Sequence, residues 1–281
     1  MTTEAKRPTR VYDAKHRMPP ILPYLSETLG HLQFAYQKAL LDRRGAHKDT
    51  WFGKAWNVLN PLLLGMVYWL LVIVIFERGG DDGLAVLTQI VGGLFLYQVP
   101  SASVNLGARS IVGGGSFVLN TRLPRMLLPI SSVVMAFLNF APSLAVYAVF
   151  HVVAGYPIGP HLLWGIPILA LVVLLSLGLA LAIATLQVYF RDIASFLPYV
   201  IRIGMYLSPV IYLYTAYPDG LEWAIFVNPL GAMFASWQQV LFEGTAPSAT
   251  FMLAGLAWAG SAIIGGTLLF LWRERYFAIR L

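Results

Sequence analysis

Polar and aromatic side chains recur at helical spacing inside the apolar runs of this sequence. In one run Tyr199, Arg202 and Tyr206 follow one another at steps of three and four residues. Aromatic rings stack on the apolar faces of sugars and amides form hydrogen bonds with hydroxyls, so such side chains suit a passage for carbohydrate. Hydrogen bonding between helices is the alternative for each residue. We predict that the conduit is lined by two tyrosines of this run, Tyr199 and Tyr206, together with Asn57, Asn60, Tyr68 and Tyr97.

Other chemistries lack the residues that they require. The sequence has no cysteine, which excludes thiolate metal sites and cysteine nucleophiles. Its one Gly-Lys pair, Gly53-Lys54, is followed by alanine, whereas a phosphate-binding loop continues with Ser or Thr. No acid falls within an apolar run, which disfavours a carrier driven by an ion gradient. We therefore predict a non-catalytic chain that binds no cofactor or metal of its own.

The composition indicates an integral membrane protein. Of 281 residues, 58% are hydrophobic and 11% are charged, whereas soluble domains have about 25% charged residues. A membrane-spanning helix needs about 20 apolar residues. We predict an all-α fold with six transmembrane helices near 57–76, 86–108, 127–154, 162–189, 195–215 and 248–271.

The basic residues predict the orientation of these helices. Of the 19 Lys and Arg residues, 17 fall in the two termini and in the connections on the same side of the membrane, and Arg202 lies in the fifth span near that side, which leaves only Arg78 on the opposite side. Since such residues favour the cytoplasmic side, both termini are expected in the cytoplasm, as in a multi-pass protein of a bacterial plasma membrane. Because the basic residues flank the spans, membrane lipids and cytoplasmic proteins suit them better than nucleic acid.

The segments outside the spans have distinct patterns. Residues 1–30 read as a basic cytoplasmic tail, with prolines that favour extended structure over its first 25 residues. Residues 31–56 begin with an amphipathic helix over 31–44, for which we favour the membrane surface over a partner protein. The six-span domain is 57–281, and within it 216–247 predicts two short re-entrant helices that begin at Pro218 and Pro229.

The turn between the fourth and fifth spans carries Arg191-Asp192, and Arg202 follows within the fifth span. Asp192 is placed to cap the fifth span by accepting hydrogen bonds from its free amides. Arg191 can bind a lipid diphosphate with the forked geometry of guanidinium. Anchoring of the turn at the cytoplasmic interface is the alternative for Arg191, and Arg202 can extend towards the same interface.

Four strings, in this order along the chain, resemble the membrane subunits of ABC-type polysaccharide exporters. They are Trp56–Leu62, Gln187–Ile193, Tyr206–Tyr212 and Asn228–Leu230. The resemblance is to the Wzm family of O-antigen, capsule and teichoic-acid permeases, and it extends over about 31–281. The basic, proline-containing tail resembles actinobacterial members, including the mycobacterial exporter of lipid-linked cell-wall galactan.

This resemblance implies a homodimer served by two copies of a cytoplasmic ATPase of the Wzt type, which binds ATP and Mg²⁺. It implies export of a polysaccharide linked to polyprenyl diphosphate, from the cytoplasmic to the outer side. A permease for drugs or lipids and a structural membrane protein are the alternatives. The segment 110–125 is the candidate for a helix that couples to the ATPase, with a solvated basic turn as the alternative. Its predicted contacts are Phe117, Asn120, Arg122 and Arg125.

Overall fold

The computed structural model describes residues 20–46, 51–71, 73, 83–115, 121 and 123–280. Within these residues all regular structure is helical, which confirms the predicted all-α membrane fold. Among the described residues, four segments are long and apolar enough to cross a membrane, by length and composition. They are α4 (Gly83–Gly113), α6 (Leu127–Val153), Pro160–Tyr189 and Ala249–Tyr276.

The other two predicted spans correspond to shorter helices. α3 (Trp56–Leu70) and α8 (Ile193–Leu207) have 15 residues each. The residues that follow α3 lie largely outside the described part of the chain. α8 ends eight residues before the predicted boundary, because Pro209 follows closely and the residue before a proline disfavours helical dihedrals.

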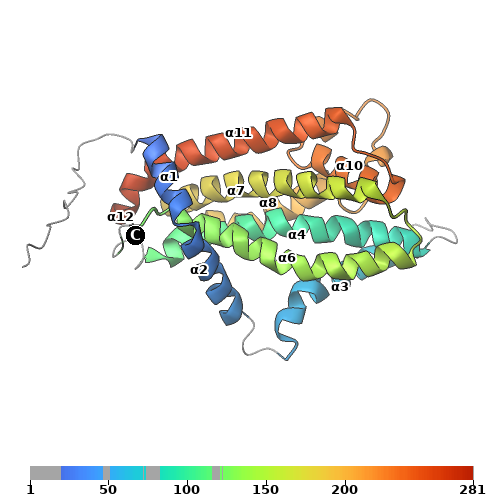
Figure 1. Ribbon diagram of the computed structural model, residues 1–281, viewed down its shortest axis with the longest axis horizontal. Coiled ribbons are helices and arrows are strands. Elements are labelled where there is room, and N and C mark those ends of the chain that lie inside the picture. The colour runs from blue at the N-terminus through green and yellow to red at the C-terminus, as the bar shows by residue number, and fades with distance from the viewer. Residues whose placement is uncertain are drawn as a thin grey trace, which may run out of the picture.

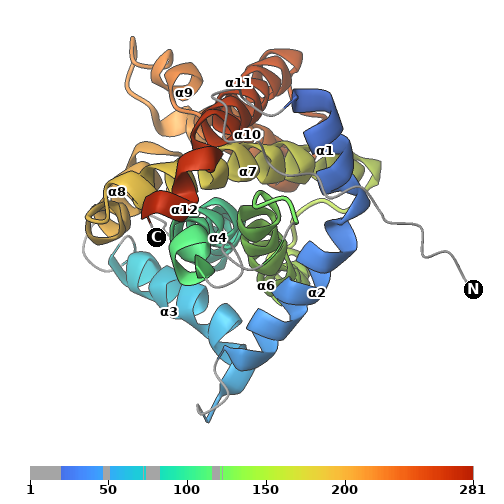
Figure 2. The same cartoon turned by 90° about the vertical axis from the view of Figure 1, so that its left-hand side faces the viewer.

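Helix α4 is the centre of the bundle. It packs against α3, α6, α8 and α7 (Gly165–Tyr189), and the end-on view of Figure 2 shows these helices around it. Its residues from Ile90 to Tyr97 are all buried. An apolar helix that is buried on most of its surface is expected to have little hydrophobic asymmetry, so its burial cannot be read from periodicity.

Helix α11 (Ala249–Arg273) packs along α7, as Figure 1 shows. The two backbones approach closely where Gly178 of α7 meets Gly266 of α11. A Cβ atom added to either glycine would overlap the backbone of the other helix. Small residues at such crossings allow the close approach that gives membrane helices their packing energy.

The N-terminal region departs from the prediction of an extended tail. α1 (Ile21–Gly30) is a helix, and α2 (Leu32–Gly45) follows it after a turn at His31. Pro23 lies in the first turn of α1, where backbone amides have no acceptor within the helix, so proline is tolerated there. The extended interpretation was therefore wrong for residues 21–25.

The amphipathic segment over 31–44 is helical, as predicted. Its small residues Ala35 and Ala39 are buried, and α2 packs against α6. Tyr36 and Leu41 lie on its exposed surface. α2 therefore attaches to the bundle through its alanine face and leaves larger side chains outside.

Short helices also form in the segment after α8. η4 (Tyr214–Ala216) is followed by α9 (Ala224–Val227), α10 (Gly231–Gln238) and the π-helical turn η5 (Gln239–Glu243). The two predicted short helices are thus present as α9 and α10. They begin after the two prolines, since Gly220 makes a turn with φ of +83° and the Asn228 side chain accepts a hydrogen bond from Leu230 N.

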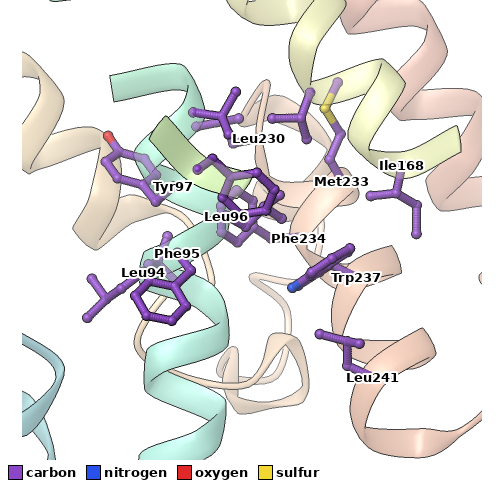
Figure 3. Packing of buried hydrophobic residues seen from close by; sticks show 14 of the residues in the cluster. Leu94, Phe95, Leu96, Tyr97, Ile168, Leu230, Met233, Phe234, Trp237 and Leu241 are labelled. Carbon is purple, nitrogen blue, oxygen red and sulfur yellow. The ribbon is translucent and has the colours of Figure 1, made fainter. Parts of the chain in front are cut away.

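Every residue of α10 is buried. Figure 3 shows Met233, Phe234 and Trp237 of this helix directed into the cluster that contains Phe95 and Leu96 of α4. The rings of Tyr97 and Phe234 have centroids 6.3 Å apart. A helix too short to cross a membrane therefore contributes much of the apolar core.

We expect Gly266→Ala to destabilise the α7–α11 contact, because its new methyl would overlap the backbone of Gly178. Overpacking of this kind costs about 1–3 kcal/mol. Gly265→Ala is the matched control on the same helix, since a Cβ there meets nothing within 4 Å. The thermal unfolding midpoint in detergent should fall for Gly266→Ala alone. Equal midpoints for the two variants would show that the close contact is absent.

Candidate functional site

Helix α8 ends at Leu207, where the chain turns into the interior of the bundle. Ser208 is extended, with ψ of 151°, and both Ser208 and Val210 are buried. A helix end leaves carbonyl groups without donors in the helix. In a membrane protein these groups must find partners within the protein, because lipid offers none.

Side chains from the segment after α8 supply the donors. Asn228 Nδ2 donates to Leu207 O and to Ser208 Oγ, each at 2.9 Å. Tyr217 Oη donates to Leu207 O at 3.0 Å, and Tyr212 Oη donates to Tyr206 O at 3.2 Å. Two of the strings that carry the sequence resemblance, Tyr206–Tyr212 and Asn228–Leu230, therefore meet in space at this helix end.

Gln238 continues the same network from α10. Its Nε2 donates to Pro209 O at 2.7 Å and to Tyr212 O at 2.9 Å, and its Oε1 accepts from Tyr214 N at 2.7 Å. Sequence reasoning missed Gln238. The signal was a glutamine within an otherwise apolar segment, since a buried amide requires partners for all of its polar atoms.

Four of the sequence-predicted residues lie on one surface of the subunit. We call Tyr68, Tyr199, Arg202 and Tyr206 the α3/α8 face; Figure 2 shows the two helices on the same side of the bundle. The hydroxyls of Tyr68 and Tyr206 are 2.8 Å apart, and their rings are nearly perpendicular, with centroids at 6.3 Å. Tyr199 is 67% exposed and Tyr206 is 45% exposed. Asn60 is also exposed on α3.

Asn57 and Tyr97, in contrast, connect helices of the same subunit. Asn57 Nδ2 donates to Asn139 Oδ1 at 3.2 Å, and Gln98 Nε2 donates to Asn57 O at 2.7 Å. Tyr97 is 8% exposed and donates to Ile201 O at 2.5 Å. These contacts correspond to the helix-packing alternative. Of the predicted conduit residues, Tyr68, Tyr199 and Tyr206 therefore lie on the α3/α8 face, whereas Asn57 and Tyr97 do not.

Arg125 is the one member of the predicted coupling contacts that the structure describes; Phe117, Asn120 and Arg122 lie outside the described residues. Arg125 Nη1 donates to Glu274 O at 2.8 Å, and its backbone N donates to Glu274 Oε1 at 3.3 Å. Tyr24 Oη donates to the same carboxylate oxygen at 2.8 Å. This cluster joins α1, the residues before α6 and the end of α11.

The Tyr24 phenol is protonated in its contact with Glu274. Burial, and then the charge of Glu274 and its hydrogen bond, raise the pKa of Tyr24 above its usual value. The phenol therefore keeps its proton and remains a donor.

The contacts of Arg125 with Glu274 make Arg125 part of the fold. A test of coupling to an ATPase therefore requires charge reversal at Arg122 with Arg125 left intact.

The turn between α7 and α8 places Arg191 and Asp192 at the surface. Asp192 occupies the N-cap position of α8, but its side chain makes no capping hydrogen bond. The capping prediction was wrong in this respect. Asp192 has helical dihedrals, φ −70° and ψ −15°, instead of the extended conformation that directs an N-cap side chain towards the free amides. Arg191 Nη2 donates to Arg280 O at 3.5 Å.

The long apolar helices and the buried helix end define a multi-pass α-helical membrane protein. The sequence model of the ABC-2 type transporter family matches residues 39–242. The chain belongs to this family and is a membrane subunit of a transporter.

Curated relatives support a narrower similarity. The chain is 29% identical over 205 residues to an O-antigen export system permease protein RfbA of Klebsiella pneumoniae, covering 73% of this chain and 78% of that protein. It is 26% identical over 236 residues to the protein of the same name in Myxococcus xanthus, covering 78% and 86%. These relatives confirm the resemblance to Wzm-type permeases.

We expect Gln238→Leu to destabilise the protein, because it leaves Pro209 O, Tyr212 O and Tyr214 N without their shared partner. Each unsatisfied buried group costs about 1–3 kcal/mol. Ser236→Ala on the same buried helix is the control, since Ser236 Oγ donates only to Ala232 O within α10. The midpoint of thermal unfolding in detergent checks this. A Gln238→Leu protein as stable as Ser236→Ala would contradict the role given to Gln238.

Proposed function

We propose that this chain is the permease of an exporter that moves a polysaccharide linked to polyprenyl diphosphate from the cytoplasmic to the outer side of a bacterial plasma membrane. The observation that carries the proposal is the α3/α8 face, where three tyrosines and an arginine lie on one surface of an apolar bundle. A polar surface on membrane helices is costly in lipid, so it is expected to face protein or a water-filled passage.

The chemistry of the α3/α8 face suits a polymer. A chain that moves stepwise requires many weak contacts, because one tight site would slow its release. Aromatic rings provide such contacts, since each stacks on a sugar with modest energy and in any register. The names of the relatives, which are O-antigen export permeases, point to the same class of substrate. The basic, proline-containing tail favours a cell-wall galactan among the candidates.

The proposed assembly contains a second copy of this chain and two copies of an ATPase of the Wzt type. One small bundle cannot enclose a glycan, so the α3/α8 faces of two copies are proposed to line a shared conduit. The ATPase, with ATP and Mg²⁺, supplies the energy. The distribution of basic residues favours a cytoplasmic position for both termini, and the segment 110–125 is proposed to contact the ATPase on the same side.

Export in cells that carry variants of this gene tests the function. We expect Tyr199→Leu and Tyr206→Leu to lower the surface polysaccharide several-fold, since loss of a contact of about 1 kcal/mol changes a rate or affinity by about fivefold. The measurement is the ratio of surface to intracellular lipid-linked glycan at equal protein abundance.

Tyr36→Leu is the matched control for this test. Tyr36 is 46% exposed and Tyr206 is 45% exposed, but Tyr36 belongs to α2, which Figure 2 shows on the other side of α4 and α6 from α8. It should leave the ratio unchanged. If deletion of the whole gene leaves the surface polysaccharide intact, the proposed function is wrong, and drug or lipid export becomes the better account.

A further inference from the structure

Arginines gather round Tyr189 at the end of α7. The Arg273 guanidinium lies 5.2 Å from the centroid of the Tyr189 ring, and the Arg280 guanidinium lies 4.6 Å from it. Arg191 Nη2 reaches the backbone oxygen of Arg280. We call Arg191, Arg273 and Arg280 the arginine cluster. Its members come from the α7–α8 turn, the end of α11 and the last described helix.

The fold builds this cluster from segments distant in sequence. The close α7–α11 contact at Gly178 and Gly266 aligns the ends of the two helices. The chain then turns through η6 (Glu274–Tyr276) into α12 (Phe277–Arg280), and the Phe277 ring packs in the core, 5.3 Å from that of Phe270. Because the Phe277 side chain is buried in the core, α12 is held against the bundle and Arg280 lies next to Tyr189.

Within the described part of the chain, none of the three arginines of the cluster forms an ion pair, not even Arg191 with the neighbouring Asp192. The one ion pair found there joins Lys38 and Asp42 on α2. The acid nearest in sequence to Arg273 is Glu274, whose carboxylate is buried and accepts from Tyr24 and Arg125. Cation–π contacts with Tyr189 position two guanidiniums but leave their charge uncompensated. Three such groups together favour an anion.

The surroundings of the cluster indicate that the anion belongs to a lipid. Arg273 also stacks on Trp272 at 3.8 Å, and Trp272 is 49% exposed, as is typical of a residue at the membrane interface. The apolar side chains of Phe190 and Ile279 are exposed beside the cluster in sequence, at 63% and 81%. A ligand here meets guanidinium and apolar side chains together.

We propose that the arginine cluster binds the phosphoryl group of a membrane lipid. Guanidinium binds phosphate oxygens with two parallel hydrogen bonds, and three guanidiniums offer enough donors for a mono- or diphosphate. The identification of the diphosphate carrier lipid as one source rests on the proposed export function. A phospholipid of the inner leaflet and free diphosphate are the other sources of the same chemistry.

Binding to the purified full-length protein in detergent tests this site. The probes are farnesyl diphosphate, phosphatidylglycerol and inorganic pyrophosphate, with farnesol as the uncharged control. We expect Arg280→Gln to weaken binding of the phosphorylated lipids about tenfold, the change expected on loss of one charge-assisted hydrogen bond. Because the Arg280 side chain is exposed, we expect the Arg280→Gln protein to fold.

Arg275→Gln is the matched control. The Arg275 guanidinium lies 4.6 Å from the centroid of the Tyr276 ring, and the arginines that contact the Tyr189 ring within the described residues are Arg273 and Arg280. Loss of Arg275 nevertheless changes the net charge by the same amount. It should leave the affinities within twofold. Equal effects of the two variants, or no effect of Arg280→Gln, would overturn the proposal, because diffuse charge would then explain the binding.

The three probes separate the sources of the phosphoryl group. Tighter binding of farnesyl diphosphate assigns the site to the carrier lipid, and equal binding of phosphatidylglycerol assigns it to phospholipid. Pyrophosphate that binds as well as the lipids would contradict the lipid assignment. The measurement requires neither ATPase nor export, so failure of this site leaves the export proposal intact, and failure of the export test leaves this site measurable.

Discussion

The architecture depends on one constraint: helix α8 ends inside an apolar bundle, and its terminal carbonyl groups must find donors there. The Ser208-Pro209 sequence ends the helix. The side-chain amides of Asn228 and Gln238 then donate hydrogen bonds to the backbone carbonyl groups that have no partner within the helix. Gly93 allows the backbone at Val210 to pack closely against α4, because a Cβ atom at position 93 would overlap the carbonyl of Val210. Without these partners the turn would leave several polar groups unpaired in a region of low polarity.

Two consequences follow for the rest of the molecule. The segment after α8 must enter the core to deliver its amides, which explains why all of α10 is buried although it is too short to cross a membrane. α8 itself remains short and peripheral, so its outer surface is available. Tyr206 lies at this junction: its backbone oxygen accepts from Tyr212, and its hydroxyl meets Tyr68. The helix end that stabilises the fold thus also orients the α3/α8 face.

The sequence allowed the long helices to be predicted closely, because run length and the near absence of charge determine what can cross a bilayer. It also placed short helices after α8, since two prolines interrupt an apolar segment. Contacts between residues far apart in the chain could not be predicted from the sequence. Nothing local in Tyr24, Arg125 or Glu274 indicates that they meet. Tyr97 and Tyr206 were both predicted to line the conduit, yet Tyr97 is buried and Tyr206 is exposed, because the spacing of side chains along one helix does not identify the neighbouring helix that they face.

We propose that the α3/α8 face is exposed to water when the transporter works. The natural chain has no cysteine, so single substitutions can be labelled with a charged maleimide that does not cross membranes. Tyr206→Cys is compared with Ile264→Cys, which lies 61% exposed on α11 and should face lipid. With the partner ATPase and ATP present, we expect labelling at position 206 and none at position 264. Absence of labelling at 206 in every nucleotide state would contradict it.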